Sequence, residues 1–224
     1  VGANGATGVV KRDAATGARQ GRVAFGPGLT PTALLAVPSG DRAQLVVLAN
    51  DASGALRAVA RNADDGRLVR RFALAPDLSA GRAAFVPGPG GDPLVVAVAS
   101  NLDAGGTYLV AFDPTGGAPT VSLLANLASG LDMAVLGDVG GGPAHDVAVL
   151  GTAHDGVVVA TVADPLTGSL LAAPEFPAGY LTDRLVALGP GNALAALGRA
   201  IGSGSVLTLR HAVTGAALGS FPIL

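Results

Sequence analysis

Short apolar runs separated by turn residues extend along the whole chain. One turn signature begins with Asp, Asn or His, ends with Gly, and occurs at residues 13–17, 62–66, 113–116, 164–168 and 211–215. Its closing glycines, Gly17, Gly66, Gly116, Gly168 and Gly215, follow one another at intervals of 49, 50, 52 and 47 residues. An Asx side chain accepts hydrogen bonds from the backbone two residues on, and Gly supplies a positive φ. Each signature lies between two apolar runs and therefore predicts a β-hairpin with a shared turn conformation.

Two further apolar runs precede the hairpin in four of the five copies. One unit has them at Met133–Leu136 and Asp146–Leu150. The other units have them at 34–37 and 44–48, at 83–86 and 93–98, and at 184–188 and 193–197. The runs are mostly continuous rather than alternating, which is typical of strands buried on both faces. Gly and Pro bound them closely, so we expect almost no helix.

Four short strands that repeat about every 50 residues predict an all-β fold, the β-propeller. One such meander cannot bury both of its faces alone, whereas radial stacking of the units buries them. We expect a single propeller domain or propeller fragment over 1–224, with a partial blade at 1–28 and full blades at 29–76, 77–126, 127–178 and 179–224. A β-sandwich gives no reason for a repeat, and a right-handed β-helix needs shorter coils.

The first copy of the repeat is incomplete. Aligning Asp13 with His211 places Val1 at the end of a second strand, so this blade carries only its last two strands. We expect the segment from Gly8 to Phe25 to pack as a strand pair against the next blade. A partner chain or further sequence is expected to cover its free edge. The start at Val1 instead of Met favours a piece of a larger ring over a five-bladed ring with a stunted first blade.

Composition narrows the class of protein. Half of the 224 residues are hydrophobic and only 13% are charged, which argues against a disordered chain. The absence of Cys excludes disulfides and thiolate metal sites. No apolar stretch is long enough to span a membrane as a helix. We expect no nucleic-acid partner, because the net charge is −2 and no aromatic residues alternate with the arginines.

Charge is unevenly distributed along the chain. Residues 1–82 carry a net charge of +5 and residues 83–224 carry a net charge of −7. One interpretation is attraction between neighbouring copies of the chain. The other, which we favour, is chance variation on solvated loops.

The units resemble the bacterial FG-GAP/VCBS-type, integrin-like propeller repeats. The stretch that carries the resemblance runs from Gly137 to Val149 and reads GDVGGGPAHDVAV. Members of that family have an acidic loop between the first two strands of a blade, and such loops bind calcium. Asp138 and Asp146 match the first and last acidic positions, whereas Gly140 and Gly142 replace the middle two. The resemblance implies a weak calcium candidate at Asp138 and Asp146 and no other cofactor.

Other candidate chemistry is sparse. His145 and His154 each precede an Asp, but neither spacing forms a recognised zinc motif. His211 occupies a position that Asp or Asn fills in the other turns, so we expect it to have a turn role. The chain has no nucleophile elbow, no P-loop lysine and only one Glu, Glu175. We therefore expect no catalytic residue and no enzyme.

The leading hypothesis is a non-catalytic binding, adhesion or assembly module outside the cell, at the cell surface or in the periplasm. Its expected partner is a protein or carbohydrate ligand, or copies of itself in an assembly. The alternative is the propeller domain of a secreted enzyme, either quinoprotein-like or sugar-active. The chain has no Trp to stack on a quinone and no paired acids for a glycosidase.

Overall fold

The computed structural model describes residues 5–101, 103–177, 180–189, 192–200 and 204–223, and these residues are nearly all β. Within them the first ten strands are β1 (Ala6–Arg12), β2 (Arg19–Pro27), β3 (Thr30–Ser39), β4 (Arg42–Asn50), β5 (Leu56–Asn62), β6 (Leu68–Ala75), β7 (Leu78–Pro87), β8 (Pro93–Asn101), β9 (Thr107–Phe112) and β10 (Thr120–Leu123). The remaining strands are β11 (Ser129–Val135), β12 (Val147–Thr152), β13 (Val158–Ala163), β14 (Leu170–Ala172), β15 (Tyr180–Leu188), β16 (Ala193–Ala200), β17 (Gly204–His211) and β18 (Ala217–Ile223).

The described residues contain the 3-10 segment η1 (Pro89–Gly91) and a 3-10 residue at Gly189, which confirms the expectation of almost no helix. None of the described residues belongs to a helix that is long and apolar enough to cross a membrane.

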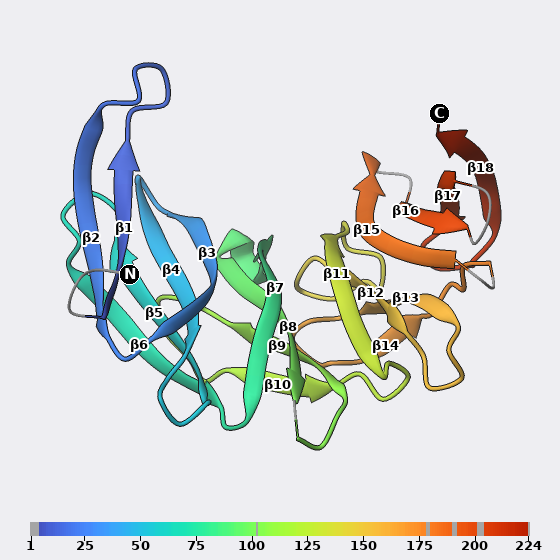
Figure 1. Ribbon diagram of the computed structural model, residues 1–224, viewed down its shortest axis with the longest axis horizontal. Helices are drawn as coiled ribbons and strands as arrows, with labels where there is room; N and C mark the ends of the chain where they lie inside the picture. The colour runs from blue at the N-terminus through green and yellow to red at the C-terminus, as the bar shows by residue number, and fades with distance from the viewer. Residues whose placement is uncertain (1–4, 102, 178–179, 190–191, 201–203, 224) are drawn as a thin grey trace.

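The strands form four four-stranded antiparallel sheets and one two-stranded sheet, as predicted. The four-stranded sheets are β3–β6, β7–β10, β11–β14 and β15–β18, and β1 pairs with β2. We refer to these sheets as blades 1 to 4 and to β1–β2 as the N-terminal hairpin. The first strands of consecutive blades contact one another, so β3, β7, β11 and β15 line the inside of the arrangement (Figure 1).

The core lies between the blades rather than within one of them. Blade 1 contributes Leu48 and Phe72 to a cluster that also holds Val95 and Phe112 of blade 2. Similar clusters join blade 2 to blade 3 and blade 3 to blade 4. Small and branched side chains on both faces of each blade permit this stacking, which explains the continuous apolar runs in the sequence.

The N-terminal hairpin packs against blade 1, which confirms the predicted strand pair. Val23 and Phe25 are buried against Val47 and Val59. Lys11, the only lysine of the chain, donates through Nζ to the carbonyl oxygen of Ala63 at 2.5 Å. Apolar packing and this charged hydrogen bond together fix the hairpin on the blade.

Four of the five predicted turn glycines have the expected conformation. The φ of Gly17, Gly66, Gly168 and Gly215 lies between 69° and 72°. The prediction for Gly116 was wrong, because its neighbour Gly117 has the positive φ, at 80°. Gly117 lies four residues after Asp113, the same spacing as in the other turns, so position in the turn rather than the first Gly determines the conformation.

Each innermost strand contains an irregularity that the sequence did not indicate. The pairing register of the first strand with the second shifts between Pro31 and Ala33, between Ala80 and Arg82, between Gly130 and Asp132, and between Thr182 and Arg184. One extra residue therefore bulges from the same place in all four blades. A β-bulge bends its strand and redirects the side chain that follows it.

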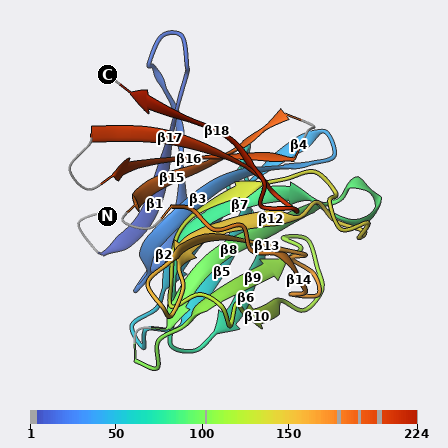
Figure 2. The ribbon, with the colours of Figure 1, turned by 90° about the vertical axis from the view of Figure 1, so that its right-hand side faces the viewer.

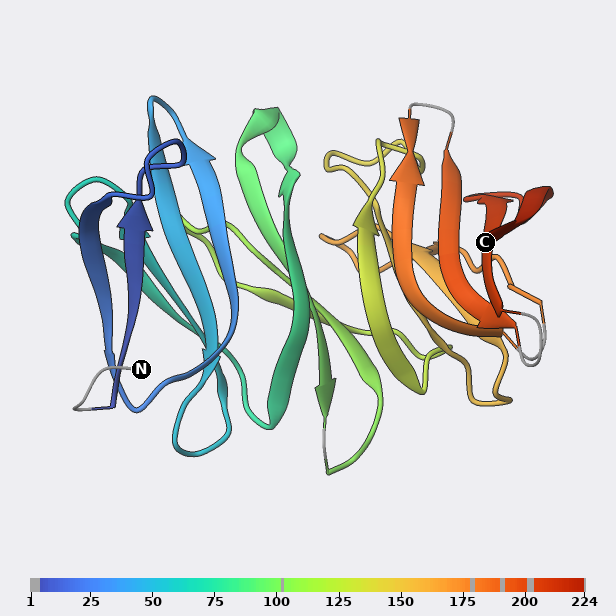
Figure 3. The same cartoon turned by 45° about the horizontal axis from the view of Figure 1, so that its top comes forward.

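The blades follow an open arc. Figures 1 and 3 show the N-terminal hairpin and blade 4 at opposite ends of the molecule, so the described residues do not form a closed ring. The edge of β1 that faces away from β2 has no paired strand among the described residues, and its covering by a partner chain or further sequence remains a prediction. The sequence Gly-Ser-Gly at 202–204 also predicts a turn, between the second and third strands of the last blade, and most of this turn lies outside the described residues.

Candidate functional site

The predicted acidic loop connects β11 to β12 in blade 3. Asp138 Oδ1 accepts hydrogen bonds from the N–H groups of Gly141 and Gly142 at 2.6 and 3.0 Å. Asp146 Oδ2 accepts hydrogen bonds from the N–H groups of Val139 and Gly140 at 2.7 and 2.8 Å. Four consecutive N–H groups thus point at the two carboxylates, and the carboxylates hold the glycine-rich loop in shape.

Asp146 is fully buried at the base of this loop. Burial raises the pKa of Asp146, the two N–H hydrogen bonds oppose that rise, and the charges of Asp164 and Asp138 add to it. Its second oxygen, Oδ1, is buried and has no hydrogen-bond partner among the described residues. The side chain is therefore stabilised through one oxygen only.

These residues fit a loop-closing role better than a calcium site. Calcium takes six to eight oxygen ligands, whereas each carboxylate here already has one oxygen occupied by two N–H groups. The described residues contain no group of three His, Asp or Glu side chains that could hold a metal ion. Asp138 and Asp146 therefore remain a weak calcium candidate that rests on the family resemblance.

The histidines divide into turn and loop residues. His211 Nδ1 accepts hydrogen bonds from the N–H groups of Val213 and Thr214, both at 3.2 Å, which confirms its turn role. The backbone N–H of His145 donates to the carbonyl oxygen of Pro87, so the acidic loop is attached to blade 2. His154 lies in the turn between β12 and β13.

A pocket of about 430 Å³ lies between the N-terminal hairpin and blade 1. Phe25, Pro27 and Leu29 line it on the hairpin side, and Val59 and Phe72 line it on the blade side. A largely apolar cavity of this size is typical of ligand sites. The sequence did not indicate it, because its walls come from two units of the repeat.

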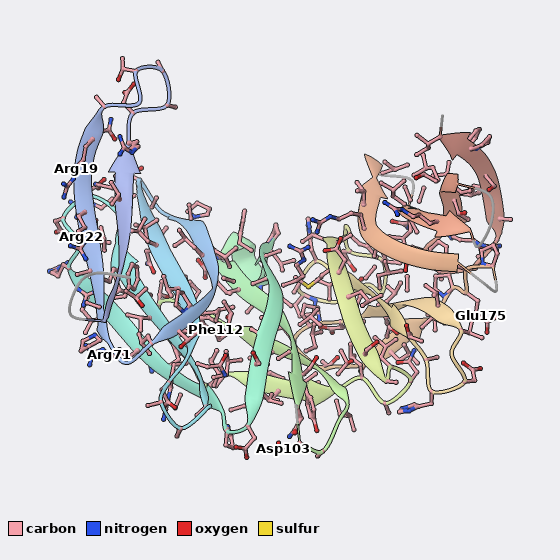
Figure 4. All side chains as sticks on the ribbon, in the orientation of Figure 1. Arg19, Arg22, Arg71, Asp103, Phe112 and Glu175 are labelled. Atoms are coloured by element: carbon pink, nitrogen blue, oxygen red, sulfur yellow. The ribbon has the colours of Figure 1, made fainter. Side chains whose placement is uncertain are left out.

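Charged groups surround the apolar part of this pocket. Arg57 donates to Asp51 at 2.7 Å, and hydrogen bonds from the Ser53 hydroxyl and from Arg57 lower the pKa of Asp51. Arg71 also lines the pocket, is exposed, and has no ion-pair partner among the described residues. Figure 4 shows Arg19, Arg22 and Arg71 along the same end of the molecule. This end therefore attracts anionic groups.

Similar structures establish the fold, while no protein-family model and no curated protein matches the chain. Kuenenia stuttgartiensis hydrazine synthase aligns with 96% of this chain and 60% of its own length, at 12% identity and a TM-score of 0.70. The Dos1 propeller aligns with 97% of this chain and 53% of its own length, at 11% identity and a TM-score of 0.64. KlAtg21, in its complex with the coiled coil of AgAtg16, aligns with 99% of this chain and 68% of its own length, at 10% identity and a TM-score of 0.57.

These likenesses show a β-propeller, and the chain spans about half the length of the Dos1 propeller. One of the three names is that of a synthase and another is that of a protein in complex with a coiled coil. A shared fold therefore assigns no activity, because propellers carry different sites on similar blades.

Proposed function

We propose that the protein is a non-catalytic, extracellular or surface propeller module that binds an acidic segment of a partner protein. The observation that carries this proposal is the pocket beside Arg71, which combines an apolar wall with an arginine that has no ion-pair partner within the described part of the chain. An acidic peptide with one aromatic or aliphatic side chain offers a complementary ligand. Its apolar side chain would fill the pocket while its carboxylate pairs with the guanidinium.

The N-terminal third of the chain supports this choice of ligand. Residues 1–82 carry a net charge of +5, and Arg22 and Arg71 lie on the elements that border the pocket. The surface potential of this end would speed the approach of an acidic partner. The extracellular location is part of the proposal and rests on the resemblance to surface propeller repeats.

Titration calorimetry with two matched peptides tests the proposal. An acidic peptide with a central Phe is expected to bind, and the same peptide with Lys in place of its acids is not. Arg71→Glu should weaken binding by about tenfold or more, since it removes a charged hydrogen-bond donor. Arg42→Glu makes the same charge change at an exposed arginine that does not line the pocket, and it should change the affinity much less.

Two results would contradict the proposal. One is equal loss of affinity in the Arg71 and Arg42 variants, which would indicate attraction by net charge alone. The other is binding of neutral oligosaccharides in the pocket with no binding of the acidic peptide.

A further inference from the structure

The face of blade 4 that points away from blade 3 is apolar, and no described residue of another blade covers it. We call this side of a blade its forward face, because in blades 1 to 3 it contacts the next blade. The forward face of blade 4 exposes five large apolar side chains, Val186, Leu188, Leu197, Phe221 and Ile223. Phe221 is 52% exposed and Val186 is also 52% exposed. Figure 2, viewed from this end, shows no other described element beyond blade 4.

The equivalent positions in the other blades are buried interfaces. The strand registers align Leu188 with Val37, Val86 and Leu136, which are at most 4% exposed, while Leu188 is 42% exposed. They align Leu197 with Leu48, Val98 and Leu150, all buried. They also align Phe221 with Phe72, which is buried against Phe112 of the next blade. Blade 4 thus presents the same kind of surface that each other blade buries.

Charged residues on the innermost strands indicate which side chain a neighbour of blade 4 would need. Arg82, Asp132 and Arg184 each follow the bulge of their strand and are therefore equivalent. Arg82 of blade 2 pairs with Asp132 of blade 3, Nε to Oδ1, at 3.3 Å. Asp132 Oδ2 in turn accepts the N–H of Leu185 in blade 4 at 3.0 Å. Arg184 is exposed and has no such partner among the described residues.

From these observations we infer that the forward face of blade 4 docks a further propeller blade whose innermost strand carries a carboxylate for Arg184. We call the opposite side of a blade, which contacts the preceding blade, its backward face. The backward face of the docked blade must be rich in Val and Ala, since Val147 and Val149 lie on the backward face of blade 3. A second copy of the described chain does not supply it. The hairpin at its free end lacks an innermost strand, and Arg22 lies beside Gly8 on that surface. This inference does not depend on the proposed function.

A cysteine reporter tests the inference, because the chain contains no other thiol. Val186→Cys should react rapidly with a maleimide in the chain of 224 residues, which should be monomeric by light scattering. Residues 126–176, which include Asp132 and the backward face of blade 3, are then appended after Leu224. Labelling of Val186→Cys should slow by at least about tenfold, as a newly buried site reacts only on opening. Leu170→Cys, exposed on β14, should label at the same rate in both chains.

Charge reversal separates the specific interface from general shielding. Arg184→Asp places two carboxylates beside each other and should raise the labelling rate in the extended chain about threefold, and Asp132→Arg in the appended copy should slow labelling again. A second extension guards against a failure of the appended blade to fold. It is a copy of residues 77–125 carrying Arg82→Asp, whose backward face already covers Phe72 in the same chain.

Three results would overturn the inference. The first is unchanged labelling in both extended chains. The second is a slowdown that does not respond to either charge change. The third is a dimer of the unextended chain in which Val186→Cys is already protected, because a second copy would then be the occupant.

Discussion

Single residues in this protein act mainly by closing turns and joining blades. The closing glycine of the hairpin turn lies against the preceding blade in several units. A side chain at Gly168 would clash with Ser122 of blade 2, while Gly66 faces Val23 of the N-terminal hairpin. In three units an arginine directly before the turn also stabilises it. Arg12, Arg61 and Arg210 each donate a hydrogen bond to the carbonyl oxygen of the closing glycine of their turn.

We expect Gly168→Ala to destabilise the protein more than Gly17→Ala. Both glycines have φ of 70°, so each substitution should cost about 1–2 kcal/mol in backbone strain. Of these two glycines, only Gly168 lies against another side chain, that of Ser122, and relieving this overlap should cost a further ~1–3 kcal/mol. Urea denaturation measures both values. In a Ser122→Gly background the extra cost should disappear, and equal costs without that change would show that the contact carries no strain.

Asp146 should make stability depend on pH. Its pKa is raised in the folded state, so the folded chain holds this proton more tightly than the unfolded chain does. The stabilisation is full below the unfolded pKa, about 4, and is lost as pH rises through the raised folded pKa. Unfolding free energies from pH 4 to 7 should therefore decline for the unsubstituted chain relative to Asp146→Asn. Parallel curves for the two proteins would contradict this assignment.

Calcium should have little effect on stability. Two acidic positions of the family pattern are Gly140 and Gly142, and the remaining carboxylates bind N–H groups. The melting temperature should change little in millimolar calcium. A rise of many degrees that Asp138→Ala abolishes would instead show a calcium site at this loop.

At the scale of strands and loops, the repeat made most of the fold predictable. Each hairpin needed an Asx or His acceptor and a glycine, and these residues are visible in the sequence. The bulges could not be predicted from the sequence, because the residues around them, such as Pro31 and Gly130, follow no common pattern. The pocket beside Arg71 was also missed, since two units that each look ordinary create it together.

The bulge at Asp132 gives a prediction for one element. Asp132→Ala should destabilise the protein by about 1–3 kcal/mol, because it leaves the Leu185 N–H without an acceptor in a buried place. Asp132→Asn keeps an acceptor oxygen and should cost less, since the Arg82 side chain is 46% exposed and its ion pair contributes little. Guanidinium denaturation compares the two. Equal losses for Asn and for Ala would mean that the charge, which both substitutions remove, and not the acceptor for the N–H is what the site needs.

The whole molecule should open from its ends. Blade 2 is covered on both faces, whereas blade 4 is covered on one. Amide hydrogen exchange should therefore be slower in β8 than in β16, although both are second strands. The matched comparison is β12 of blade 3, which should resemble β8. Equal protection of β16 and β8 would indicate that covering the second face of a blade adds no protection.

The position of each hairpin turn against the preceding blade has a consequence for synthesis on the ribosome. As residues emerge in order, the surface that receives Gly66 or Gly168 has already been made, because Val23 and Ser122 precede them in the chain. Every new blade can then dock on a finished neighbour, without waiting for a distant segment. Contacts between the described blades join neighbours in sequence, which keeps loop-closure entropy low. Assembly of the described blades can thus proceed at the pace of translation, one blade after another.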